Sequence, residues 1–325
     1  MSSLESVTPR PVDSVEVTVL VDGFVDVLMP GDQTVRRAPV REDWLEAGSQ
    51  LRAEHGYSLL VRVREGPDQH LLLYDAGLGR DTAVHNLDVL GVGLGELRAV
   101  VLSHGHADHH AGLLGVVRRV GRRGLPLVLH PDAWRMRRVE FPDGTVIRLP
   151  PPSSADLARE GVEVVEERGP SLLLDGTVLV SGQTERVTEF EKGLPNQKAL
   201  GASGWEPDPW VWDDQSVVVN VKGAGLVVLS GCSHSGAVNV LLNARRVTGV
   251  SQVLAFIGGL HLSGPLFEPS IDPTVEALRG ISPAYLVPGH CTGWRATHAL
   301  ARAFPDRFVQ TSVGTTLVFG AARPR

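Results

Sequence analysis

Apolar and polar residues along the chain form two kinds of run, and the order of these runs predicts the fold. Short runs rich in valine and leucine are typical of sheet strands. They cover residues 15–28, 58–64, 71–74, 100–102 and 127–130, and then 162–166, 171–174, 178–181, 216–221, 226–230, 253–257 and 284–287. Helical patterns at 113–120, 239–248 and 273–280 lie between them. Strands and helices that interleave in two halves predict an α/β fold of two sheets, packed face to face and covered by helices.

Four segments do not follow this pattern. Residues 31–53 are polar and mixed, and we expect an insertion there with room for one short helix. Residues 134–152 carry several arginines and three consecutive prolines, while 196–214 is a long loop rich in glycine, proline and tryptophan. We expect both to be insertions on the substrate side. Residues 1–13 are expected to form a flexible lead, and the chain 1–325 to form a single domain without a linker.

Composition narrows the class of protein. Hydrophobic residues make up 42% of the 325, which is enough for a large core. The net charge of −6 argues against a nucleic-acid-binding surface. No apolar run is long enough to span a membrane, and the N-terminus lacks the apolar core of a signal peptide. Two cysteines exclude a disulfide framework. We therefore expect a cytoplasmic protein that binds neither nucleic acid nor membrane, with its oligomeric state open.

The run Ser-His-Gly-His-Ala-Asp-His at 103–109 is the most informative motif. It follows a buried strand and precedes a helical pattern, so its side chains can converge on one point. Imidazole and carboxylate groups are good ligands for zinc and similar ions. His104 and His106 can hold one ion from an extended loop, while Asp108 and His109 are displaced enough to reach a second. Asp108 also suits the handling of a water proton.

Further candidate ligands end later apolar strands. His234 and His290 each follow such a strand in a glycine-flanked loop, and we expect both to bind metal. Cys232 is either a thiolate ligand or a small buried hydrophobe. His261 is either a ligand or an acid or base on the substrate side.

Two more residues are candidates for roles beside the metal. Asp75 ends a strand and is expected to orient a ligand histidine by accepting a hydrogen bond from its ring. His55 either reaches the mouth of the metal site or caps a turn.

These motifs together resemble the metallo-β-lactamase superfamily. His-x-His-x-Asp-His is its signature. The segment around Asp75 is similar to the strand that precedes this motif in the family, and the segments ending in Cys232 and His290 are similar to two later strands. Glu54-His55-Gly56, Gly258-Gly259-Leu260-His261 and the cysteine-containing loops resemble the branch labelled as similar to dihydropterin–ribofuranosylaminobenzene phosphate synthase. The resemblance implies an αββα sandwich of two mixed sheets. It also implies a divalent metal centre of one or two ions, for which zinc is expected and manganese and iron are the alternatives.

One feature departs from the family pattern. Most members carry a ligand histidine in a Gly-His-Thr segment, which here corresponds to Ser181-Gly182-Gln183-Thr184. We expect His234 to replace it. Because Cys232 stands where most members have a bridging aspartate, the number of ions remains open.

The predicted chemistry is hydrolysis by metal-bound hydroxide of an ester, lactone or phosphodiester-type small molecule. Alternatives are a dihydropterin-linked synthase or transferase that uses the same site, and a metal-binding protein without catalysis. Arg135, Arg137, Arg138 and Arg148 could receive an anionic substrate or form a solvated basic face. The tryptophans at 205, 210 and 212 could cover a ring-bearing substrate or pack their own loop.

Overall fold

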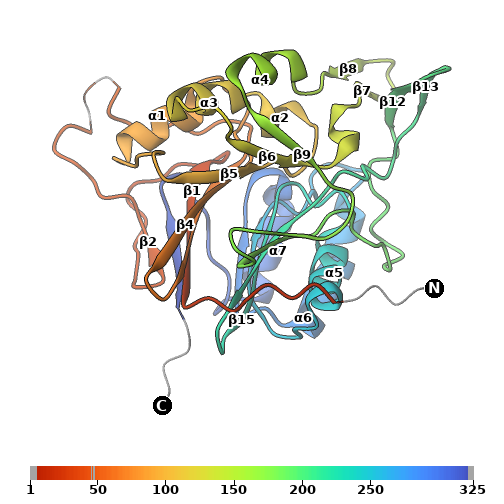
Figure 1. Ribbon diagram of the computed structural model, residues 1–325. Helices are drawn as coiled ribbons and strands as arrows, with labels where there is room; N and C mark the ends of the chain where they lie inside the picture. Colours follow the sequence, from red (N-terminus) through yellow and green to blue (C-terminus); the bar gives the residue numbers. More distant parts are fainter. Residues whose placement is uncertain (1–5, 45, 47, 321–325) are drawn as a thin grey trace.

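Two large sheets pack against each other in the computed structural model, which describes residues 6–44, 46 and 48–320 (Figure 1). The first has the strand order β2-β18-β1-β3-β4-β5-β6-β9 and the second β10-β11-β14-β15-β16-β17. Strands β4, β5, β6 and β9 run parallel, as do β15, β16 and β17, while the other neighbours are antiparallel. Both sheets are therefore mixed, as expected.

The strands have the following bounds. The first sheet contains β1 Ser14–Val21, β2 Val35–Arg36, β3 Ser58–Glu65, β4 Asp68–Tyr74, β5 Leu97–Val101, β6 Pro126–Leu129, β9 Glu163–Glu166 and β18 Thr316–Gly320. The second contains β10 Ser171–Leu173, β11 Val178–Val180, β14 Val217–Val221, β15 Gly225–Ser230, β16 Val253–Gly258 and β17 Tyr285–Pro288.

Helices cover the outer faces of both sheets. Those on the first sheet are α1 Thr82–Val89, α3 Leu113–Val120 and α4 Ser154–Glu160, and those on the second are α5 Ala237–Thr248, α6 Ile271–Ile281 and α7 Trp294–Ala303. The short helix α2 Ala107–His110 and the 3-10 turns Pro131–Trp134, Glu268–Ser270 and His290–Thr292 complete the set. None of the helices in the described residues has the length and hydropathy needed to cross a membrane.

Three apolar layers hold this arrangement together. The central layer lies between the sheets and joins Val17 and Val61 to Val219 and Val227. A second layer packs α1, α3 and α4 on the first sheet, and a third packs α5, α6 and α7 on the second. Because each sheet is apolar on both faces, the fold is the αββα sandwich that the sequence predicts.

Helix α3 shows how the sequence builds these layers. Leu113, Val116 and Val117 are buried against the sheet, while Arg118 and Arg119 point to solvent. Gly121 ends the helix in the left-handed conformation at φ 68°. The apolar stripe therefore sets the face that packs, and the glycine sets the point where the chain turns.

A third, small sheet corrects the expectation of a long loop at 196–214. Strands β12 Gln197–Gly201 and β13 Gly204–Pro207 form a hairpin that pairs through β12 with β7 Arg137–Glu140, and β7 pairs with β8 Val146–Leu149. The two expected insertions thus combine into one antiparallel sheet in the order β13-β12-β7-β8. Their backbone groups pair across 60 residues of sequence, which a single-sequence pattern does not reveal.

Three further expectations need correction. The lead at 1–13 is anchored from Val7 on, because Val7 and Arg10 donate backbone hydrogen bonds to Val247 and Gly176, and Val12 is fully buried; residues 1–5 lie outside the described residues. The insertion at 31–53 forms β2 and turns, with no helix among its described residues. The first strand also ends at Val21 rather than at residue 28.

Candidate metal centre

The candidate ligands gather where the parallel strands of both sheets end. His104, His106, Asp108 and His109 follow β5 of the first sheet, whereas Cys232 and His234 follow β15, and His290 follows β17, of the second. Open α/β sheets collect functional groups at the carboxyl ends of their parallel strands. The facing sheets thereby bring together residues more than 180 positions apart.

The first group of ligand atoms consists of three histidines. His106 Nδ1 lies 3.2 Å from His234 Nε2, and the rings of His104 and His234 are 4.7 Å apart. Two nitrogens bound to one tetrahedral zinc at about 2.0–2.1 Å lie about 3.3 Å apart. The separation of these two nitrogens fits a shared ion, and the replacement of the family histidine by His234 stays a prediction. Gln183, in the segment that would carry that histidine, is exposed.

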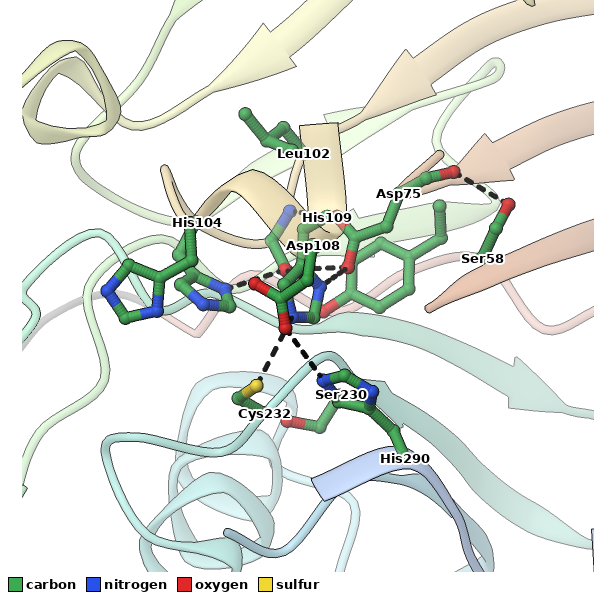
Figure 2. Close-up of polar contacts among 12 residues, drawn as sticks. Ser58, Asp75, Leu102, His104, Asp108, His109, Ser230, Cys232 and His290 are labelled. Atoms are coloured by element: carbon green, nitrogen blue, oxygen red, sulfur yellow. Dashed lines mark hydrogen bonds and ion pairs between the residues drawn. The ribbon is translucent and has the colours of Figure 1, made fainter. Parts of the chain in front are cut away.

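The second group surrounds Asp108. Its Oδ2 lies 3.3 Å from His290 Nε2 and 3.5 Å from His109 Nε2, and Cys232 Sγ lies 3.2 Å from the same His109 nitrogen. Figure 2 shows Asp108 and His109 meeting Cys232 and His290 from the opposite sheet. Ligand atoms of these four residues all lie within 4.8 Å of one another.

Cys232 joins the two groups. Its Sγ also lies within 4.8 Å of ligand atoms of His104 and His234. The thiol is buried at the point where the groups meet, and a bridging role for it stays a prediction. The donor set suits one ion on either side of the sulfur, and the number of ions stays a prediction.

Hydrogen bonds on the outer side of each ring leave the inner nitrogen free. The Ser103 hydroxyl donates to Asp75 Oδ2 and therefore accepts from His104 Nδ1, so that His104 Nε2 is buried without a partner among the described residues. His106 Nε2 donates to Gln197 Oε1 at 2.7 Å. His109 Nδ1 donates to Asp75 Oδ2 at 2.6 Å. Such outer acceptors fix the tautomer and aim the second lone pair at a metal.

The charges of the rings differ between the two groups. Burial lowers the pKa of His106 to about 4, with the Arg137 guanidinium adding to the effect, and burial holds the pKa of His104 and His234 well below the ordinary value. At His109 burial opposes the charged form, but Asp108 and Asp75 outweigh it and raise the pKa to about 9. The first group therefore offers neutral lone pairs, and the second favours positive charge, which a divalent cation would supply.

A buried ion pair supports the loop 103–109, called the metal loop below, on the side away from the candidate ligand atoms. Arg137 is fully buried on β7 and donates to both carboxylate oxygens of Asp213 and to Asp208. Asp213 Oδ2 also accepts the backbone N–H of Gly105 at 2.7 Å. The position of Gly105 between His104 and His106 means that this network fixes the loop that carries both rings.

The remaining candidates lie at the cavity beside the centre. The His55 side chain is 77% exposed, and its Nε2 lies 3.8 Å from Asp108 Oδ2. The His261 ring lies 4.4 Å from that of His234. Both residues line a cavity of about 730 Å³. The structure thus brings every candidate from the sequence to one place, while their roles stay predictions.

Sequence reasoning missed four residues of this site. Ser103, Gln197 and Asp213 hold the metal loop, and Cys291 lies beside Cys232. Ser103 and Cys291 adjoin ligand histidines, so their positions carried a signal. Gln197 lies 91 residues from His106, and no spacing pattern pairs them.

The four arginines and three tryptophans that the sequence suggested as substrate contacts do not line the cavity described above. Arg135 and Arg137 pair with carboxylates, Arg138 pairs with Glu140, and none of these lines the cavity. Arg148 is exposed and also absent from the lining. Trp205 packs on Arg138, and Trp210 and Trp212 flank Arg186. The sequence left open whether these side chains contact a substrate; the observed contacts favour packing for Arg135, Arg137, Arg138 and the three tryptophans, which contact residues of the small sheet and its neighbouring loop.

Comparisons with known proteins agree with this geometry. The sequence model described as "Metallo-beta-lactamase superfamily" matches residues 51–247. A curated relative from Methanocaldococcus jannaschii, 7,8-dihydropterin-6-methyl-4-(beta-D-ribofuranosyl)-aminobenzene-5'-phosphate synthase, is 26% identical over 86% of this chain and 94% of its own.

Solved structures show the same fold. Tm1679, described as a metal-dependent hydrolase of the beta-lactamase superfamily, superposes with a TM-score of 0.71 at 23% identity, over 94% of this chain and 99% of that one. The metallo-beta-lactamase fold protein YhfI from Bacillus subtilis reaches 0.50 at 14% identity, over 94% of this chain and 100% of its own.

Proposed function

Because this chain belongs to the metallo-beta-lactamase superfamily, whose members are mostly enzymes that bind divalent metals, we propose that it is a metal-dependent hydrolase. Its substrate is an ester or lactone of a small, largely apolar molecule. The observation that carries the proposal is the convergence of two ligand groups on Cys232 beside an open cavity.

The residues divide the work as follows. His104, His106 and His234 would hold one ion, and Asp108, His109 and His290 would hold the other, with Cys232 within reach of both. A divalent ion in such a site lowers the pKa of bound water and polarises a carbonyl oxygen. Asp108 Oδ2 faces the cavity and accepts the proton of the attacking water, and the exposed His55, 3.8 Å away, passes it to solvent.

The lining of the cavity favours an uncharged, apolar substrate. One wall comes from the β7–β8 hairpin with Val139, Phe141 and Ile147, and another from Leu266 and Phe267. Among the residues that the structure describes, no lysine or arginine belongs to the lining. A volume of about 730 Å³ lies in the range of sites for drug-sized ligands, which bind mainly by apolar contact. Esters and lactones therefore fit this site better than phosphodiesters do.

The synthase reading remains the second candidate. It rests on the relative from M. jannaschii, which matches nearly the whole chain and whose name specifies a 5'-phosphate product. Among the described residues that line the cavity there is no lysine or arginine to pair with a phosphate, so its positive partners there would be the divalent ions and His290.

The test combines metal analysis with a substrate panel. Protein purified without chelator should carry one to two equivalents of a transition metal, most of it zinc, by mass spectrometry. Zinc-loaded protein should hydrolyse aryl esters with apolar acyl chains and alkyl lactones at least about tenfold faster than a bis-aryl phosphodiester. Asp108→Ala should abolish this turnover with an unchanged circular dichroism spectrum.

Three results would redirect the proposal. Protein that binds no metal even after reconstitution contradicts it outright. Metal-loaded protein without turnover on the panel supports the non-catalytic alternative. Formation of the dihydropterin-linked phosphate product, without ester or lactone hydrolysis, supports the synthase.

A further inference from the structure

The second cysteine of the chain lies against the proposed centre, in a role that neither the sequence pattern nor the family signature assigns. Cys291 Sγ, Cys232 Sγ and a ring nitrogen of His261 all lie within 4.8 Å of one another. The three residues follow β17, β15 and β16, which are adjacent parallel strands. We propose that Cys291 is a metal ligand, and that with Cys232 and His261 it forms a sulfur-rich donor group selecting soft divalent ions such as zinc, cobalt or cadmium over manganese or magnesium.

Close packing brings the two sulfurs together. A Cβ built on Gly259 would lie 2.6 Å from Cys291 Sγ and 2.6 Å from the Gly231 carbonyl oxygen. Only a glycine therefore lets the Cys291 sulfur approach the loop that carries Cys232. Two thiolates on one tetrahedral zinc lie about 3.8 Å apart, because each Zn–S bond is about 2.3 Å. The observed limit of 4.8 Å is compatible with that arrangement.

The backbone is strained at all three strand ends. Ser233, His261 and His290 have φ of 56°, 48° and 49°, a region that non-glycine residues rarely enter. Such strain persists where the surrounding structure needs a particular side-chain direction. Here it turns the chain so that Cys232, His261 and Cys291 face one point.

One ring nitrogen of His261 lies in surroundings that suit a metal ligand. Its Nδ1 is buried and has no hydrogen-bond partner among the described residues. A buried ring nitrogen without a partner carries a desolvation penalty, which coordination of a cation would remove. The ring is held between His234 and Phe267, with centroids 4.4 and 4.6 Å away.

Donor chemistry sets the choice of ion. Thiolates prefer zinc and other soft ions, whereas manganese and magnesium prefer oxygen ligands. A centre with two sulfurs should therefore bind cadmium or cobalt far more tightly than manganese. This inference rests on the proposed function for the presence of a metal at Cys232, and it adds the second sulfur.

Cobalt substitution tests the proposal, because each cysteine contributes one thiolate and the chain has two. Full-length protein is stripped with chelator and reloaded with cobalt under anaerobic conditions. Near-ultraviolet thiolate-to-cobalt charge-transfer absorption and bound cobalt are then measured. Cys291→Ser and Cys232→Ser should each lose about half of the absorption per protein, and the double variant all of it. Cys291→Ser should also weaken cadmium binding by about tenfold or more while leaving manganese binding unchanged.

Full charge-transfer intensity in Cys291→Ser would overturn the inference while the proposed function stands. Failure of the unmodified protein to bind cobalt, zinc or cadmium would overturn both. A measurement on the unmodified protein guards against a variant that does not fold. Iodoacetamide should label Cys291 at least about tenfold more slowly in zinc-loaded than in metal-free protein. Mass spectrometry identifies the labelled cysteine, and equal labelling rates of Cys291 in the two forms would contradict its ligation.

Discussion

Each histidine of the first motif uses one ring nitrogen outside the centre and keeps the other inside it. Ser103, Gln197 and Asp75 take the outer nitrogens of His104, His106 and His109. The cost of a substitution at this scale therefore depends on which side of the ring it touches. Loss of an inner nitrogen removes a ligand, whereas loss of an outer acceptor only releases the orientation of a ring.

His234 gives the sharpest test at the residue scale. His234→Ala should lose zinc as severely as His106→Ala, because their nitrogens face each other at 3.2 Å. Gln183→Ala is the matched control from the segment where most relatives carry the histidine, and it should keep its metal because Gln183 is exposed. Zinc content and affinity by competition with a chelating dye provide the measurement. Metal retention in His234→Ala with loss in Gln183→Ala would place the ligand on the earlier segment.

The candidate ligands were predictable because they belong to short motifs at strand ends. Cys232 and His234 share such a motif, and so do His104 to His109. Gln197 and Asp213 were not predictable, because their contacts to the metal loop exist only once the small sheet has formed. Local patterns thus reveal ligands, and tertiary pairing supplies the groups that orient them.

At the scale of elements, a carboxylate from a neighbouring segment holds helix α5 in place behind the centre. Glu191 accepts the backbone N–H groups of Val238 and Asn239 in the first turn of α5, where Gly236 offers no side-chain cap. Asn239 in turn accepts the N–H groups of Val187 and Thr188. These reciprocal bonds fix the start of the helix that directly follows the His234 loop.

Removal of this cap should lower the stability of the protein. Glu191→Ala leaves two buried N–H groups without an acceptor, and we expect a loss of about 2 kcal/mol in the free energy of unfolding. Glu189→Ala, at an exposed position in the same segment, is the control and should change stability by less than about 0.5 kcal/mol. Denaturant unfolding of both variants gives the comparison, and equal midpoints would show that the cap contributes nothing.

The β7–β8 hairpin should set the preference for the acyl group of the substrate. Phe141 and Ile147 line the cavity but remain 41% and 48% exposed, so they have apolar surface to offer a ligand. Phe141→Ala should raise KM for long-chain esters about 5–20-fold with little change in kcat, since it removes about 1–2 kcal/mol of apolar contact.

Val146 on the same hairpin provides the control for this measurement. It is 49% exposed and does not belong to the cavity lining. Val146→Ala should therefore leave KM unchanged. An equal effect of both substitutions would mean that the hairpin acts through its stability and not through contact with substrate.

Elements with a regular apolar period were predicted well, and the others were not. Strands β14, β15 and β16 and helix α5 lie within a few residues of their predicted bounds. Strand β8 of the small sheet was missed because Val146 and Ile147 are exposed, so it lacks an alternating buried face. Strand β12 was missed although Gln197 and Ala199 alternate as buried residues, because it is short and lies in a segment rich in glycine, proline and tryptophan. Helices α1, α4 and α7 were missed as well; α4 buries Leu157 and α7 buries Ala296 and Leu300, which leaves little apolar periodicity to detect.

At the scale of the whole molecule, the proposed centre connects the two sheets. His104 to His109 belong to the first sheet, and Cys232, His234 and His290 to the second. An ion bound by both sets would cross-link the halves of the sandwich at one edge. Metal binding should therefore stabilise the entire fold and not only its loops.

Removal of the metal should lower the melting temperature of the protein. Binding at a hundred times the dissociation constant adds about 2.7 kcal/mol. For a chain of 325 residues, this corresponds to a decrease of about 4 °C after chelation. Calorimetry of zinc-loaded and chelator-treated protein measures the shift, and re-added zinc should reverse it. His104→Ala should show a much smaller response, and an equal response would mean that the chelator acts elsewhere.

The small sheet has two sides with different freedom to change. Its inner strands, β7 and β12, carry Arg137 and Gln197, which hold the metal loop in place. The turn between β7 and β8 carries Phe141, which lines the cavity. A loop graft across 141–147 can therefore exchange specificity while the catalytic machinery is inherited intact. A graft of the complete sheet would also replace Gln197, which accepts the hydrogen bond of the His106 ring. Diversification of this scaffold, in nature or in the laboratory, has its least costly route through that one turn.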